Sequence, residues 1–99
     1  MPLWILDEKL LCVLDANAAS LTLYGYSREE MIGKLARELR PTEEIERFET
    51  FVSREVIQGD AGSWTHKRKD GTTFTVNIRY HGIEYNGRRA RFVIATPVE

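Results

Sequence analysis

The chain has 99 residues, which suits a single domain spanning 1–99, and its apolar fraction of 42% is ordinary for a soluble globular fold. Fourteen basic and fifteen acidic side chains leave a net charge of −1, so no long-range field favours a nucleic acid or an anionic membrane. No apolar run reaches the ~20 residues of a membrane span and the first residues do not resemble a signal peptide, so we expect a cytoplasmic domain without membrane insertion.

Two short apolar runs open the chain, from Leu3 to Leu6 and from Leu10 to Leu14, with polar residues between them. This pattern predicts a first antiparallel pair of strands. In the first run both alternating sets of residues are apolar, which is typical of a strand with protein on both faces. We therefore expect that strand to be central in its sheet.

Short helices are predicted next. Asn17 can accept hydrogen bonds from free amides at the start of a helix over 18–24, and Gly25 suits its left-handed end. Ser27 and Glu30 have the spacing of a capping box, in which each side chain accepts from the other's backbone amide. The sequence therefore predicts a second short helix immediately after the first.

The longest helix is predicted to begin at Thr42, whose side chain could cap it, with two acidic residues in the first turn where the helix dipole is positive. Apolar side chains then recur at spacings of three and four, which places them on one face. This stripe consists of Ile45, Phe48, Phe51, Val52, Val56 and Ile57. We expect it to lie against the sheet.

Two hairpin signals, Asp70-Gly71 and Asn86-Gly87, organise the rest of the chain. Both dipeptides tolerate positive φ at two successive residues, which a tight two-residue turn between twisted strands requires. They predict three antiparallel strands. The middle one alternates cleanly, and its core face carries Phe74, Val76, Ile78 and Tyr80. The last strand is apolar on both faces, so we expect it to be central and to pair with the first.

Two motifs resemble those of PAS domains. The stretch 17–34 is similar to the family's pattern Asn-x-Ala, then Gly-Tyr-Ser-x-Glu-Glu, two hydrophobic residues and Gly-Lys. The stretch 68–71 is similar to its Arg-Lys-Asp-Gly turn. The likeness covers essentially the whole chain. It implies an α+β fold, with a five-stranded antiparallel sheet in the order 2-1-5-4-3 and several helices on one face.

The resemblance also implies a function. PAS domains are regulatory modules, so we expect a sensory part of a larger bacterial signalling protein, such as a histidine kinase or a cyclic-dinucleotide enzyme, with flanking signalling domains. Many members follow the last strand with Asp-Ile/Val-Thr-Glu, whereas Pro97 stands here at the aspartate position. Either the signal relay differs or the chain was cut near a domain boundary.

The sequence does not indicate a particular cofactor. Haem-binding members carry a ligand histidine on the long helix, and none lies between Thr42 and Gln58. Light-sensing flavin members carry Asn-Cys-Arg-Phe-Leu before that helix, where this chain has Arg-Glu-Leu-Arg-Pro over 37–41. Haem and light-sensing flavin are thus disfavoured. No metal spacing or catalytic arrangement can be argued, so we expect no metal site and no catalytic residue in the domain itself.

A hollow between the long helix and the sheet is the candidate ligand site. Tyr80 and Trp64 would bring polar atoms that need a partner, and His66 lies on the same strand face as Trp64. The alternative is that these side chains simply fill the core. The predicted lining is Ile45, Phe48, Val52, Trp64, His66, Val76, Ile78, Tyr80, Val93 and Ala95.

The outer face of the sheet is the second candidate site. Phe92 and Ile94 should lie there, where no other element of the chain covers them, and Trp4 or a neighbour in the first strand would complete an exposed apolar patch. The patch predicts a homodimer. A ligand-free PAS platform for dimerisation or protein interaction is therefore the alternative to a sensor.

Six basic residues surround the two later hairpins and could suggest a nucleic-acid surface. They are Lys67, Arg68, Lys69, Arg88, Arg89 and Arg91. The near-neutral net charge favours a solvated face instead, so we expect no nucleic-acid partner.

Overall fold

The structure is a computed structural model that describes residues 1–54 and 58–98. Its helical segments are α1 (Ala18–Tyr24), α2 (Arg28–Met31), the 3-10 helix η1 (Ala36–Leu39) and α3 (Thr42–Val52). Its strands are β1 (Leu3–Asp7), β2 (Val13–Ala16), β3 (Gln58–Lys67), β4 (Thr73–Tyr85) and β5 (Arg88–Pro97). The predicted stripe residues Val56 and Ile57 lie outside the described residues.

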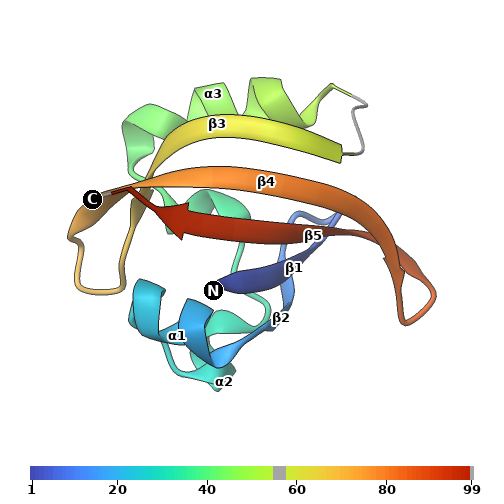
Figure 1. The fold of residues 1–99 in the computed structure, drawn as a ribbon, viewed down its shortest axis with the longest axis horizontal. Helices are drawn as coiled ribbons and strands as arrows, with labels where there is room; N and C mark the ends of the chain where they lie inside the picture. The colour runs from blue at the N-terminus through green and yellow to red at the C-terminus, as the bar shows by residue number, and fades with distance from the viewer. Residues whose placement is uncertain (55–57, 99) are drawn as a thin grey trace.

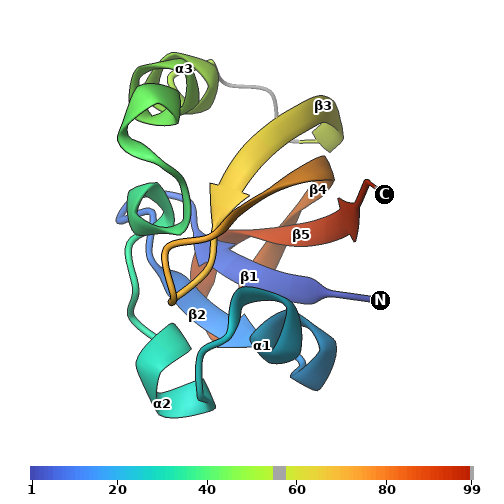
Figure 2. The same ribbon diagram turned by 90° about the vertical axis from the view of Figure 1, so that its left-hand side faces the viewer.

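The strands form one antiparallel sheet in the order β2-β1-β5-β4-β3 (Figure 1). This confirms the predicted topology and the central position of β1 and β5. Helix α3 and η1 lie over one side of the sheet, and α1 and α2 lie near its β2 edge (Figure 2). We call the side that α3 covers the inner face and the other side the outer face.

The register between the two central strands decides which residues share a face. Trp4 lies opposite Val93 and is only 3% exposed, so it belongs to the inner face and the core. The prediction that placed Trp4 in the outer patch is therefore wrong. Because β1 is apolar on both faces, its own pattern could not decide between the two orientations. Leu3 and Ile5, opposite Ile94 and Phe92, take the outer positions instead.

Local signals determine the starts of the first two helices. The Asn17 side chain caps α1 by accepting from the Ser20 amide, and Gly25 ends α1 with a φ of 80°. Ser27 and Glu30 form the complete capping box at the start of α2. Helix α3 differs from the prediction, because Pro41 holds its N-cap position and no side chain caps it. Thr42 is thus the first helical residue rather than the cap.

The second strand begins later than the apolar run suggests. The Asp7 carboxylate accepts hydrogen bonds from the amides of Lys9 and Leu10 at 2.8 and 2.7 Å, which folds this segment into a turn. Leu11 follows with a φ of 55°. The extended conformation resumes only afterwards, so β2 begins at Val13.

The two later hairpins use different turns. Asn86 and Gly87 both have positive φ, 50° and 80°, and close the tight two-residue turn that the sequence predicts. In the other hairpin only Gly71 has positive φ, and residues 68–72 form a longer loop closed by a hydrogen bond from the Arg68 amide to the Thr72 carbonyl. The prediction of a two-residue turn at Asp70-Gly71 is wrong, because the Asp70 carboxylate accepts from the Thr72 amide and stabilises the longer loop.

Candidate functional site

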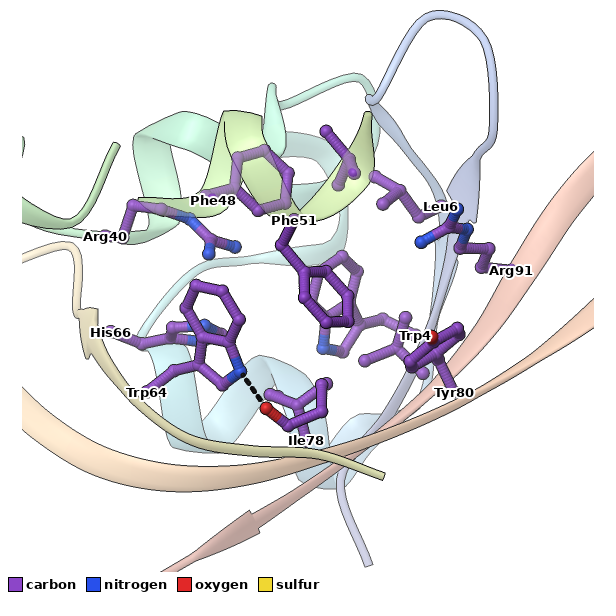
Figure 3. Close-up of a pocket in the computed structure, with 13 residues that line it drawn as sticks. Trp4, Leu6, Arg40, Phe48, Phe51, Trp64, His66, Ile78, Tyr80 and Arg91 are labelled. Atoms are coloured by element: carbon purple, nitrogen blue, oxygen red, sulfur yellow. Dashed lines mark hydrogen bonds between the residues drawn. The ribbon is translucent and has the colours of Figure 1, made fainter. Parts of the chain in front are cut away.

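A cavity of about 40 Å³ lies between the inner face of the sheet and α3 (Figure 3). Since a cavity needs roughly 10–15 Å³ of such volume to hold one water molecule, it has room for a few water molecules at most. Of the ten residues predicted for the ligand site, the structure places seven around this cavity. They are Phe48, Val52, Trp64, His66, Ile78, Tyr80 and Val93.

The other three predicted residues do not line the cavity. Val76 and Ala95 are fully buried in the adjoining core, where β4 lies beside the end of β5. Ile45 is only partly buried on α3. Six further residues do line the cavity, and the predicted set did not include them. They are Trp4, Leu6, Arg40, Phe51, Ala61 and Arg91.

Aromatic rings form much of the cavity wall. Phe51, near the end of α3, stands edge-on to Trp64 at 5.4 Å and to Tyr80 at 5.6 Å between ring centroids. The Trp64 indole N–H donates to the carbonyl of Ala61 at 3.0 Å, as Figure 3 shows. The expectation that Trp64 needs a partner from a ligand is therefore wrong, because its own strand supplies the acceptor.

His66 is a buried polar residue at the floor of the cavity. It is 1% exposed, and its Nδ1 lies 2.7 Å from the hydroxyl oxygen of Tyr24. Its Nε2 has no hydrogen-bond partner among the described residues. Burial, reinforced by the charge of Arg40, lowers the pKa of His66 well below 6.5. The imidazole is therefore neutral at pH 7 and presents one unsatisfied nitrogen.

Arg40 is the first of two buried cations at the cavity. It is 4% exposed, its Nε donates to the carbonyl of Ala36 at 3.1 Å, and its guanidinium carbon lies 3.8 Å from the centre of the Phe48 ring. Burial lowers the pKa of Arg40 to about 10, so the side chain remains positively charged at pH 7. Stacking on the ring compensates part of the cost of removing this charge from water.

Arg91 is the second buried cation. It is 5% exposed, and its guanidinium carbon lies 5.1 Å from the centre of the Tyr80 ring. Its buried Nε has no hydrogen-bond partner among the described residues. In Figure 3, Arg40 and Arg91 reach toward the cavity from opposite sides, with Phe51 between them. The cavity therefore lies between two positive charges.

The position of Arg91 corrects the proposed basic surface. Grouping it with the exposed arginines of the last hairpin is wrong, since β-strand alternation places it on the same face as Val93, two residues later. That alternation is the sequence signal that could have found it. Arg40 precedes Pro41 outside any helix or strand, where no periodic pattern predicts the direction of a side chain.

The outer face carries a contiguous set of half-buried apolar side chains, which we call the outer patch. Cross-strand pairing joins Leu3 to Ile94 and Ile5 to Phe92, so the four side chains adjoin one another on β1 and β5. No described helix covers this face (Figures 1 and 2). The patch is thus available to another protein surface.

Within 1–54 and 58–98, no three His, Cys, Asp or Glu side chains gather as metal ligands would. In the same part of the chain, no helix has both the length and the apolar character needed to cross a membrane.

Solved structures of the same fold come from several kinds of protein. The PAS domain of an HTR-like protein from Haloarcula marismortui has a TM-score of 0.81 at 18% identity, over 98% of this chain and 80% of that chain. A PAS domain from a two-component sensor histidine kinase has a TM-score of 0.79 at 16% identity, over 98% and 84%. Cycle PAS-B from Drosophila melanogaster, with bound ethylene glycol, has a TM-score of 0.84 at 10% identity, over 99% and 100%. Identities this low show a common fold.

Sequence comparison identifies the family. No curated protein sequence is significantly similar to this chain. The PAS domain profile, however, matches residues 1–96, which is almost the full length. Together with the 2-1-5-4-3 sheet and the helices on its inner face, this match shows that the chain belongs to the PAS domain family, whose members serve as sensory modules and are typically not catalytic.

Proposed function

We propose that this PAS domain is the sensory module of a larger bacterial signalling protein, such as a histidine kinase or a cyclic-dinucleotide enzyme. It binds a small molecule in the cavity under α3 and signals through the outer face of its sheet. The observation that carries this proposal is a set of buried polar atoms at a largely apolar cavity that have no partner among the described residues: Trp4 Nε1, His66 Nε2 and Arg91 Nε. A buried polar group without a partner costs about 1–3 kcal/mol, and a ligand that bonds to it removes that cost.

The size of the cavity restricts the ligand. Drug-sized molecules occupy pockets of roughly 300–1,000 Å³. The cavity here is about 40 Å³, so a haem or a flavin does not fit the space between the sheet and α3. The ligand is therefore a molecule of few atoms, or one that enters as Phe51 and the end of α3 move outward.

Strand β5 offers a direct route from the cavity to the outer face. Arg91 and Val93 line the cavity, while Phe92 and Ile94 belong to the outer patch. Because successive residues of a strand point to opposite faces, a shift of β5 caused by a ligand moves both sets together. A change in the cavity thus changes the surface that a partner contacts.

Native mass spectrometry of freshly purified protein tests the proposal. A small molecule retained by the folded chain, and lost on denaturation, is the expected result. Repeated ligand-free spectra, with no change in the NMR signals of cavity residues when cell-extract metabolites are added, would contradict a sensory role.

The second candidate is a ligand-free platform for dimerisation, which the outer patch favours. Its four apolar side chains are only half-buried, and a second copy of this domain on the same face would cover them. A dimer that persists in ligand-free protein supports the platform. A monomer at high concentration in sedimentation, unchanged by Ile94→Asp, argues decisively against it.

A further inference from the structure

The charges at the cavity define the kind of molecule that it would take. Arg40 and Arg91 both line it and are each at least 95% buried, yet none of its lining residues is acidic. Neither arginine lies within ion-pair distance of a carboxylate among the described residues. The Glu44 carboxylate lies close enough to stabilise the charge of Arg40, but it accepts from the Thr65 amide at 2.8 Å and does not line the cavity. The lining of the cavity therefore carries two positive charges and no negative one.

The donors that remain free suit a carboxylate. Only Nε of Arg40 has a hydrogen-bond acceptor among the described residues, and the Arg91 side chain has none. A guanidinium presents its N–H groups as a planar fork that matches the two oxygens of a carboxylate. Cation–π contacts with Phe48 and Tyr80 offset part of each charge, and the terminal N–H groups of both arginines have no protein acceptor among the described residues.

The remaining wall suits an apolar body rather than a fully polar anion. Phe51, Trp64 and Ile78 surround the space between the two arginines, and the indole N–H of Trp64 is already bonded to its own strand. The oxygens of inorganic phosphate that face these rings would be buried without a donor. A short hydrocarbon chain instead gains from leaving water there.

We propose that the ligand of this cavity is a small aliphatic monocarboxylate, whose carboxylate binds the free N–H groups of Arg91, with added attraction from the charge of Arg40 across the cavity, and whose chain contacts Phe51 and Ile78. This inference rests on the proposed sensory function and gives its ligand a chemical class. Because the cavity has room for a few water molecules at most, the acid displaces Phe51 as it enters. Phe51 is half-buried at the last turn of α3, where the helix ends at Val52.

Butyrate and its uncharged counterpart butyramide form the matched probes, with inorganic phosphate as the anion without an apolar body. Each is titrated at pH 7 into the purified 99-residue chain while NMR follows the backbone amides and the Nε–H of Arg91. We expect saturable shifts with butyrate and binding about tenfold or more weaker with butyramide and with phosphate, because charge-assisted hydrogen bonds are stronger than neutral ones.

Substitutions of the two arginines test where the carboxylate binds. Arg91→Met weakens butyrate binding about tenfold or more, because it removes the charged donors. Arg40→Met weakens it by a smaller factor, because it removes a charge on the other side of the cavity. Both should fold, since an apolar side chain of similar volume at a buried charge is often neutral or stabilising. Arg89→Met on the same strand is the control, because its exposed side chain does not line the cavity, and it leaves the affinity unchanged.

The outcomes separate this inference from the sensory proposal. Equal binding of butyrate and butyramide in the cavity, or unchanged affinity in both arginine variants, overturns the carboxylate but leaves a small-molecule sensor standing. If none of the three probes shifts the signal of a cavity residue, the carboxylate proposal is also overturned. If the native mass spectra are ligand-free as well, the proposed sensory function fails together with it. The comparison of butyrate with butyramide uses the unmodified chain, so it decides even where a variant does not fold.

Discussion

The two faces of the central strands contrast sharply. On the inner face, β5 buries the charged Arg91 beside Val93, while on the outer face the same strand leaves Phe92 and Ile94 partly exposed. This inverts the usual arrangement of charge outside and apolar groups inside. A buried cation needs a counter-charge within the domain, and an exposed apolar patch needs a surface from outside. In the proposed account each face has a missing partner: an anion for the inner face and an apolar protein surface for the outer face.

The contrast also bears on the proposed signalling through β5. Its inward and outward residues alternate along one backbone, so neither face can shift without the other. In the hairpin of β3 and β4, by comparison, the outward side chains are polar or exposed, as at Thr75, Asn77 and Arg79. The buried cation and the exposed apolar patch therefore occur together on β5, at the centre of the sheet.

Placing a charge in the outer patch should have the largest effect. Ile94→Asp would bury a carboxylate without a partner in the proposed dimer interface and weaken dimerisation by roughly 100-fold. Analytical ultracentrifugation measures the change. Thr96→Asp is the control, because this exposed position shares the outward side of β5 but lies outside the patch. Equal loss in both variants would point to net charge rather than to the patch.

Enlarging the cavity tests the inner face. Phe51→Ala removes a ring packed between Trp64 and Tyr80, and it should destabilise the fold by about 2 kcal/mol, less than a fully buried phenylalanine would. The larger cavity should also accept longer carboxylates, so hexanoate binding should strengthen relative to butyrate. Urea unfolding and NMR titration give the two readouts. An unchanged order of affinities would show that Phe51 does not limit the size of the ligand.

Removing one hydroxyl tests how much the buried polar groups support the fold. Tyr24→Phe leaves His66 Nδ1 without its partner, and the free energy of unfolding should fall by about 1–2 kcal/mol. Tyr26→Phe is the matched control, because that half-buried ring contacts the Lys34 ammonium and its hydroxyl has no such buried partner. Urea unfolding curves of the two variants provide the comparison. A cost no larger than that of the control would mean that water replaces the hydroxyl.

The pH dependence of stability is the smallest expected effect. His66 stays neutral in the fold because burial holds its pKa well below 6.5, whereas the unfolded chain binds a proton near pH 6.5. The unfolded state therefore binds more protons below that pH, and stability falls by up to about 1.4 kcal/mol between pH 7.5 and 5.5. Ordinary carboxylate pKa values of 3.8 and 4.5 lie below this window.

Two substitutions isolate that effect in thermal or urea unfolding at both pH values. His66→Gln should abolish the loss between pH 7.5 and 5.5, while His81→Gln at an exposed position should retain it. A loss that survives in His66→Gln would assign the titration to another group.

Much of the fold could be predicted because the signals are local. The Asn17 cap, the Ser27 capping box and the Asn86-Gly87 turn each act within a few residues, so the chain itself specifies where elements begin and end. Thr42 was wrongly assigned as a cap because Pro41 already provides the extended residue before α3. Boundaries were less predictable wherever a tertiary contact or a longer loop intervened.

The site was only partly predictable, because it depends on register and on exceptions to patterning. Trp4 lies in an apolar strand whose face is decided by its pairing with Val93, far along the chain. Arg91 has the alternation of an inward residue, but its charge suggests the surface. Arg40 lies outside any periodic element. Arg40 and Arg91 make the cavity positively charged. A rule that assigns apolar residues to the core could not predict them there.

The most direct measurement is an NMR titration of the chain with butyrate that follows Arg91 Nε–H together with the amides of Phe92 and Ile94. The account predicts saturable shifts at Arg91 and, with the same apparent dissociation constant, at the two outer residues. Shifts confined to the exposed arginines of the last hairpin, with Arg91, Phe92 and Ile94 unchanged at saturation, would contradict both the binding of a ligand under α3 and its transmission through β5.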